Sequence, residues 1–166
     1  MFEELAYRGV MLPLILIKIR RIESPIIKKR PVFFTVAISS AVFALSHLIN
    51  LLNGNIGGTF LQVGYTFLIG AMCGIVTVKT GNVILSALVH VIYNFCGMLI
   101  EYCGTGVMWT VEQMLFTAVV GVVVGAILIV VAILSDRKPE TVLGMLGDLD
   151  NDYEQNTPKT QENIAN

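Results

Sequence analysis

The stretch FEELAYRG (Phe2–Gly9) decides how the rest of this 166-residue chain can fold, because it places three charges at the head of a run that is otherwise apolar to Ile17. Each such charge costs about 2.5 to 3.5 kcal/mol at the centre of a membrane helix. Glu4 and Arg8 are four residues apart, so they share a helix face and can form an ion pair. Glu3 has no such partner, and an unpaired carboxylate in a membrane helix is by default a candidate functional group.

Composition indicates an integral membrane protein. Hydrophobic residues make up 55% of the chain and charged residues 14%, and the mean hydropathy is +0.75, outside the range of soluble globular proteins. The basic residues cluster in a loop beside membrane spans, so we expect membrane lipid as a partner and no nucleic acid. The cysteines lack CxxC spacing and are interpreted as packing residues.

The apolar segments predict an all-α fold, a polytopic transmembrane helix bundle with four to five spans and a polar C-terminal tail. About 20 residues suffice to cross a hydrocarbon core of ~30 Å. The first helix is expected to be kinked at Pro13. The predicted spans run from near Met1 to about Ile19, Val32 to Leu52, Thr59 to Val78, Val83 to about Tyr102, and Val111 to Leu134.

The polar segment Lys18–Pro31 sets the predicted orientation. It holds six of the eleven basic residues, so the positive-inside rule places it in the cytoplasm. Four predicted spans separate it from residues 135–166, which are therefore also expected in the cytoplasm. This acidic tail is expected to be disordered beyond about Gly147, Trp109 is expected at the outer interface, and the expected location is a bacterial plasma membrane.

Few polar side chains interrupt the spans, and those that do fall at overlapping depths. Glu3 and His47 lie fifteen residues from the cytoplasmic ends of their helices, or ~22 Å at 1.5 Å per residue. His90 and Asn94 lie ~13 and ~19 Å from the corresponding end of theirs. We therefore expect these groups to converge on one site within the membrane.

The residue types at this site leave its chemistry open. A carboxylate can act as a base toward water, with an imidazole as its partner or as an oxyanion donor. Carboxylate and histidine could also hold a metal, although no HExxH motif is present. Histidines that hydrogen-bond between helices, a structural Glu4–Arg8 pair, and the proton relay of a transporter are the alternatives. Gly70, Gly74 and the serines of the spans, including Ser86, are interpreted as small packing residues.

Three motifs follow one another along the chain: EExxxR at Glu3, Glu4 and Arg8, FxxxH at Phe43 and His47, and HxxxN at His90 and Asn94. In this order they resemble the motifs of the CPBP family of intramembrane proteases, also called the Abi or type II CAAX prenyl protease family. A turn at residues 80–82 is similar to the family as well, and the resemblance covers about residues 1–103.

The resemblance implies an intramembrane endopeptidase that cleaves a peptide or protein substrate in the membrane. It implies that Glu3 is the general base that activates water and that His47 shares this water. The family was long called metal-dependent, but a metal-free glutamate mechanism fits the same residues. If a divalent metal such as zinc is bound, the candidate ligands are Glu3, His47 and His90.

The same resemblance assigns the remaining motif residues. It implies that Glu4 and Arg8 hold the constellation in place, and that His90 and Asn94 stabilise the oxyanion of the scissile carbonyl. The alternative function is a non-proteolytic membrane regulator or bacteriocin-immunity-type protein on the same scaffold. An inverted repeat, which would favour a transporter, is not found in the sequence.

The predicted domain organisation has three parts. The resemblance makes residues 1–103 the protease core, incomplete at its N-terminus. Residues 104–134, an additional transmembrane helix, and residues 135–166, the tail expected to be disordered from its composition, lie outside the resemblance. Membrane helices normally precede EExxxR in the family, whereas here the motif starts at residue 3. We therefore expect an N-terminal truncation or a misplaced start, which would leave the activity class intact but this polypeptide inactive.

Overall fold

The computed structural model describes residues 2–53, 56–103 and 111–135, and within them every element is helical. The expectations for Trp109 and for the acidic tail beyond residue 135 lie outside the described residues. In chain order the elements are α1 (Phe2–Glu4), η1 (Leu5–Met11), α2 (Leu12–Arg20), α3 (Pro25–Lys29), α4 (Pro31–Ser46), η2 (His47–Asn53), α5 (Ile56–Thr80), α6 (Val83–Cys103) and α7 (Val111–Ser135).

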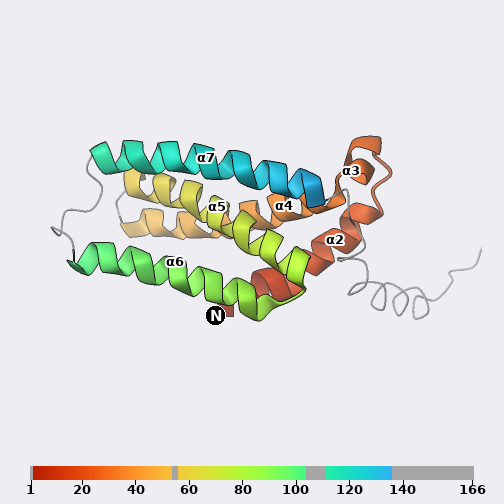
Figure 1. Ribbon diagram of the computed structural model, residues 1–166, viewed down its shortest axis with the longest axis horizontal. Helices are drawn as coiled ribbons and strands as arrows, with labels where there is room; N and C mark the ends of the chain where they lie inside the picture. Colours follow the sequence, from red (N-terminus) through yellow and green to blue (C-terminus); the bar gives the residue numbers. More distant parts are fainter. Residues whose placement is uncertain (1, 54–55, 104–110, 136–166) are drawn as a thin grey trace, which may run out of the picture.

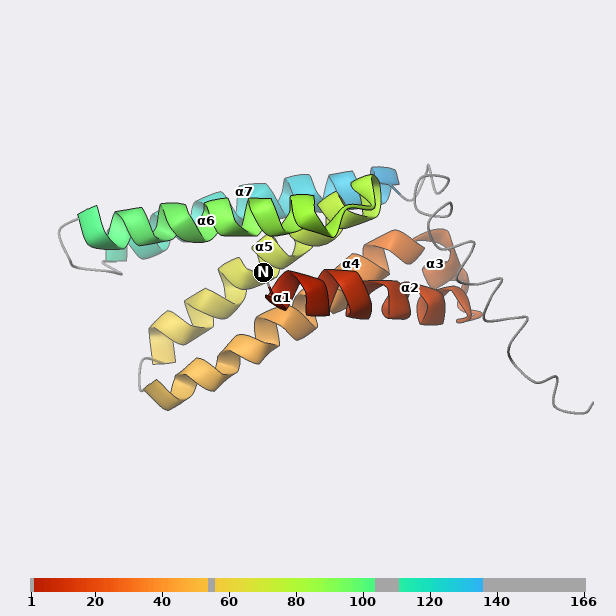
Figure 2. The same cartoon turned by 90° about the horizontal axis from the view of Figure 1, so that it is seen from below.

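Helix α5 lies at the centre of the bundle, in contact with α4, α6 and α7 (Figure 1). When the molecule is seen from below, α6 and α7 lie on one side, α1–α2 and α4 lie on the other, and α5 crosses between them (Figure 2). The N-terminal helix contacts α4, α5 and α6 through η1. The first residues of the chain therefore lie beside α4 and α6, which carry residues of the other two motifs, and beside the central helix α5.

Two of the helix boundaries follow directly from local sequence. Pro31 opens α4, where its fixed φ suits a first helical turn and its missing N–H is not needed. Between α5 and α6, Gly81 has a φ of 64°, a left-handed conformation that glycine adopts without strain. Asn82 then caps α6, because its Oδ1 accepts hydrogen bonds from the N–H groups of Ile84 and Leu85 at 2.9 and 3.2 Å.

Helical geometry changes at the first two motifs. Segment η1 is a π-helix in which the N–H of Leu12 bonds to the carbonyl of Tyr7, five residues back. This departure from α geometry comes directly before Pro13, whose ring would crowd a carbonyl one turn earlier in a regular helix. The second change is at His47, where α4 tightens into the 3₁₀ segment η2. Such irregular turns are frequent at functional sites.

The core lies where α2, α4, α5 and the end of α7 meet, and two glycines of α5 allow its neighbours to approach closely. A Cβ added at Gly74 would lie 3.3 Å from Val36, and one added at Gly70 would lie 3.2 Å from atoms of Arg8, Ser40 and Phe43. These contacts confirm the prediction that Gly70 and Gly74 are packing positions. Larger side chains here would push α4 away from α5.

We expect Gly70→Ala to lower the free energy of unfolding by about 1–3 kcal/mol, the usual cost of overpacking a close-packed interior. Gly64→Ala in the same helix is the matched control, because a Cβ there meets nothing within 4 Å. The control should be neutral or stabilising, since alanine favours helix by up to about 1 kcal/mol over glycine. Unfolding of both variants in mixed micelles measures the difference, and equal stabilities would contradict the close packing at Gly70.

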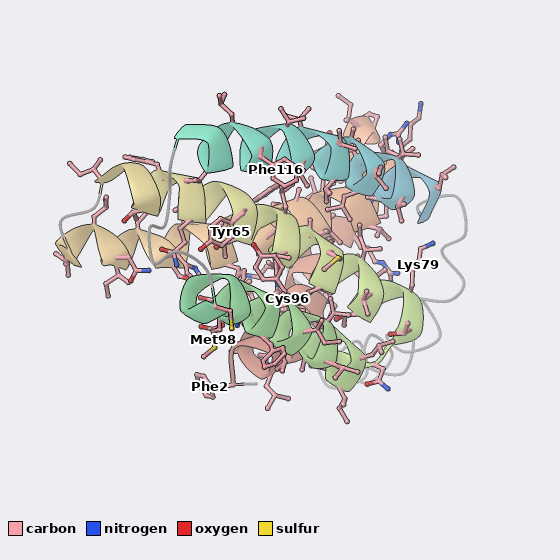
Figure 3. The ribbon with its side chains drawn as sticks, turned by 60° about the vertical axis from the view of Figure 1, so that its left-hand side comes forward. Phe2, Tyr65, Lys79, Cys96, Met98 and Phe116 are labelled. Carbon is pink, nitrogen blue, oxygen red and sulfur yellow. The ribbon has the colours of Figure 1, made fainter. Side chains whose placement is uncertain are left out.

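The outside of the bundle is largely apolar. Met98 of α6 and Phe116 of α7, both labelled in Figure 3, are examples of its exposed apolar side chains. Among the described residues, Pro31–Leu52 and Ile56–Thr80 are long and apolar enough to cross a membrane, and Val83–Met98 and Val119–Leu134 are shorter apolar helices. An all-helical membrane protein is therefore supported, whereas four to five spans and the orientation stay predictions.

Candidate active site

A buried ion pair forms the centre of the site. Glu4 and Arg8 are each only 1% exposed, and Arg8 Nη1 lies 3.0 Å from Glu4 Oε1, as their spacing in the first helix predicted. Arg8 Nη2 donates a hydrogen bond of 3.1 Å to the carbonyl of Gly70 on α5. The guanidinium thus joins the N-terminal helix to the central helix, and the absence of a side chain on Gly70 allows this approach.

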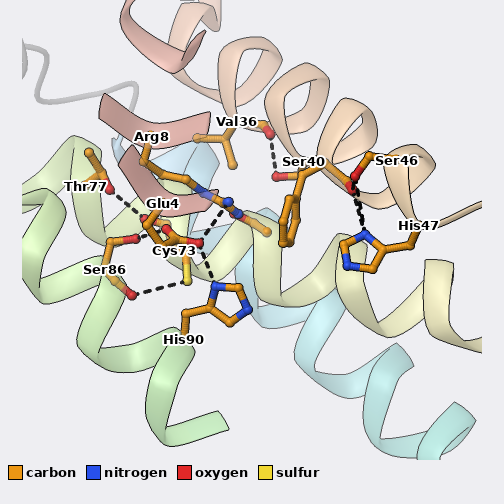
Figure 4. Close-up of polar contacts among 12 residues, drawn as sticks. Glu4, Arg8, Val36, Ser40, Ser46, His47, Cys73, Thr77, Ser86 and His90 are labelled. Atoms are coloured by element: carbon orange, nitrogen blue, oxygen red, sulfur yellow. Dashed lines mark hydrogen bonds and ion pairs between the residues drawn. The ribbon is translucent and has the colours of Figure 1, made fainter. Parts of the chain in front are cut away.

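The carboxylate of Glu4 also binds two side chains of α6 (Figure 4). His90 Nδ1 lies 2.9 Å from Glu4 Oε1, and the Ser86 hydroxyl donates a 2.6 Å hydrogen bond to Glu4 Oε2. Because the carboxylate is paired with Arg8, it is ionised and can only accept, so Nδ1 of His90 carries the hydrogen. Nε2 is then the nitrogen of His90 that remains for other partners.

Phe43 connects the second motif to this cluster. Its ring is buried and lies 4.4 Å from the guanidinium carbon of Arg8, within cation–π range. It also meets the rings of His47 and His90 edge to face, with centroids 5.1 and 5.8 Å away. The phenyl ring therefore stands between the two imidazoles and touches a residue of each of the three motifs.

His47 is held by its own helix. Its Nδ1 lies 3.0 Å from the carbonyl oxygen of Phe43, one turn earlier, and 3.4 Å from the hydroxyl of Ser46. Since a carbonyl can only accept, Nδ1 carries the hydrogen in this bond as well. Nε2 is again the nitrogen left for chemistry, so the two histidines present equivalent ring atoms.

Two of the predicted site residues lie outside the buried cluster. Glu3 precedes Glu4 on α1 but is exposed, and Asn94 is exposed on α6 one turn after His90. The structure therefore brings together Glu4, Arg8 and His90 in direct contact and places His47 next to them across Phe43. Glu3 and Asn94 lie on the same helices as Glu4 and His90, respectively, but outside the buried cluster.

Sequence reasoning interpreted Ser86 as a packing residue, but its hydroxyl binds the central carboxylate. The available signal was its position four residues before His90, which places both side chains on one face of α6. Cys73 of α5 is also buried here, and its Sγ donates to the carbonyl of Ser86 at 3.6 Å. Cys73 packs against α6 as predicted, whereas Cys96 and Cys103, which were interpreted in the same way, are exposed.

The candidate metal ligands Glu3, His47 and His90 are not gathered into one group in the described part of the chain. No group of three or more His, Cys, Asp and Glu side chains is suitably arranged within the described ranges. Both oxygens of Glu4 already bind protein groups, and His90 is directed to Glu4 through Nδ1.

Comparison with known families agrees with the three motifs. Residues 1–96 match the family model described as type II CAAX prenyl endopeptidase Rce1-like, which covers more than half of the chain. The chain therefore belongs to this family, as the resemblance predicted. No curated protein and no solved structure gave a significant match to the chain.

Proposed function

We propose that the protein is an intramembrane endopeptidase that hydrolyses a peptide bond with water activated by Glu3 and His47. Glu3 takes a proton from the water as its oxygen attacks the carbonyl carbon, and His90 and Asn94 stabilise the oxyanion that forms. As the C–N bond breaks, the proton passes from Glu3 to the leaving amine. The substrate is a peptide or protein segment that enters the membrane, and the enzyme works within lipid.

The observation that supports this proposal best is that side chains from all three motifs meet. Glu4 and Arg8 come from the start of the chain, and His90 lies more than eighty residues later, yet they are joined by contacts of 2.9 and 3.0 Å. His47 joins them through the ring of Phe43. Packing alone would not require ionisable groups from three segments at one place, because each is costly to bury.

The contacts also support different roles for the two neighbouring glutamates. Glu4 forms an ion pair with Arg8 and accepts hydrogen bonds from Ser86 and His90, so it is an anchor rather than a base toward water. Glu3 is exposed and can accept a proton. In the proposed reaction His90 has taken a second proton from solvent before water attacks, so that its Nδ1–H faces Glu4 and its Nε2–H faces the oxyanion. Glu4, Arg8, His90 and the oxyanion would then balance in charge, which is favourable electrostatic preorganisation.

A cleavage assay tests the proposal. The protein is expressed from its complete reading frame, placed in liposomes and given a library of membrane-anchored peptides, with mass spectrometry of the products. We expect cleavage that disappears when His47→Ala and His90→Ala are combined. If cleavage persists in that double variant, the assigned chemistry is wrong. If the unaltered protein folds but cleaves nothing in the library, the regulator or immunity function on the same scaffold takes its place.

A further inference from the structure

We propose that Ser86 is a positioning residue for the peptidase reaction, because its hydroxyl holds one oxygen of Glu4 so that the other oxygen can orient His90. Ser86 is fully buried, and its contact with Glu4 Oε2 is the shortest of those made by this carboxylate, at 2.6 Å against 2.9 Å for His90 and 3.0 Å for Arg8. The catalytic part of this inference rests on the proposed function.

The geometry explains why one hydroxyl can matter to a histidine that it does not touch. Arg8 and His90 both bind Oε1, whereas the only partner of Oε2 among the described residues is Ser86. Without that partner, the buried Oε2 would lack a donor, and the carboxylate would turn to share both oxygens between Arg8 and His90. Such a rotation changes the direction of Oε1, on which the orientation of the His90 ring depends.

Two buried serines of the bundle offer a test for a specific role of Ser86. Ser40 is as buried as Ser86, but its hydroxyl donates at 2.6 Å to the carbonyl of Val36 in its own helix. Ser40→Ala therefore removes a buried hydroxyl and keeps every contact of Glu4, which makes it the matched control. Ser86→Ala removes the donor, and Ser86→Cys keeps a side chain of similar size with a much weaker donor.

The first measurement is the ¹H–¹⁵N spectrum of the histidine rings in labelled protein. The chain has only two histidines, so a His47 variant assigns the signals of His90. In the unaltered protein we expect a slowly exchanging Nδ1–H of His90. This signal should persist in Ser40→Ala, weaken in Ser86→Cys and be lost in Ser86→Ala. A merely structural serine would not change it in a variant that keeps its fold.

The second measurement is steady-state cleavage. We expect Ser86→Ala to lower kcat by about 10- to 100-fold, the usual loss when a residue that orients a reacting group is removed. KM should be unchanged, because the hydroxyl does not touch the substrate. Ser86→Cys should fall between Ser86→Ala and the unaltered protein, and it replaces Ser86→Ala if that variant fails to fold.

The two measurements separate failure of this inference from failure of the proposed function. Loss of the Nδ1–H signal together with the fall in kcat supports the positioning role. If the Nδ1–H signal of His90 is unchanged in Ser86→Ala, the positioning role is wrong. It is also wrong if the signal is lost but kcat is unchanged. In both cases the peptidase function stands. If the unaltered protein has no peptidase activity, the proposed function fails and with it the catalytic part, and the spectrum alone then decides whether Ser86 orients His90.

Discussion

Glu3→Gln is expected to lower kcat by about 10²- to 10⁴-fold, the contribution of a general base to a proton transfer in the transition state. Glutamine has nearly the same size as glutamate and keeps an acceptor oxygen, but it cannot take the proton of the attacking water. Because Glu3 is exposed and apart from the buried cluster, the variant should fold and unfold like the unaltered protein. Initial rates of peptide cleavage in liposomes, with protein concentration matched, measure the effect.

Glu23→Gln is the control for this experiment. It makes the same chemical change at an exposed glutamate between α2 and α3, at the end of the bundle away from the site, so its rate should equal that of the unaltered protein (Figure 1). A Glu3→Gln enzyme that cleaves at the unaltered rate would exclude Glu3 as the base. Glu3 would then be an ordinary exposed residue that takes no part in the reaction.

The largest effect on stability is expected for Arg8→Met. Removing one partner of a buried ion pair leaves a charge without compensation and typically costs about 3–5 kcal/mol. Here Glu4 would keep only His90 and Ser86, and the link from Arg8 to the carbonyl of Gly70 would be lost as well. Unfolding in mixed micelles, followed by helical circular dichroism, measures the change in free energy.

Two further variants separate the charge of Arg8 from its shape. Arg8→Lys keeps the charge but cannot contact Glu4 and Gly70 through two separate nitrogens, so we expect an intermediate loss. Lys29→Met, on the exposed face of α3, is the control and should change stability by less than about 0.5 kcal/mol. If Arg8→Met is as stable as this control, the buried pair does not hold the N-terminal helix in place.

Much of the helical architecture could be predicted from sequence, because the signals for it are local. Long apolar runs predicted α4 through η2, α5, α6 and α7 close to their observed bounds, and the turn at residues 80–82 was identified from its residues. The short helix α3 was not predicted, since five residues are too few for a periodic pattern. The prediction that Glu4 pairs with Arg8 was confirmed because residues four apart on a helix must lie side by side.

The candidate site was only partly predictable. The position of His47 and His90 along their helices predicted that both lie at similar depths in the membrane, because this depth follows from the number of residues at 1.5 Å each. It does not determine how each helix is rotated about its axis. That rotation decides that Glu4 is buried against α6 while Glu3 is exposed, and that Phe43 packs between the two imidazoles.

The sequence by itself therefore determined the class of protein, the helices and the polar residues available for chemistry, because these depend on composition, local spacing and short motifs. Only the tertiary structure decided that Ser86 binds Glu4, that Arg8 reaches the carbonyl of Gly70, and that the Cys73 thiol contacts the carbonyl of Ser86. These contacts join residues 13 to 82 positions apart in the chain. The physical reason is that they depend on how separate helices pack against one another, and no local pattern in the sequence encodes that arrangement.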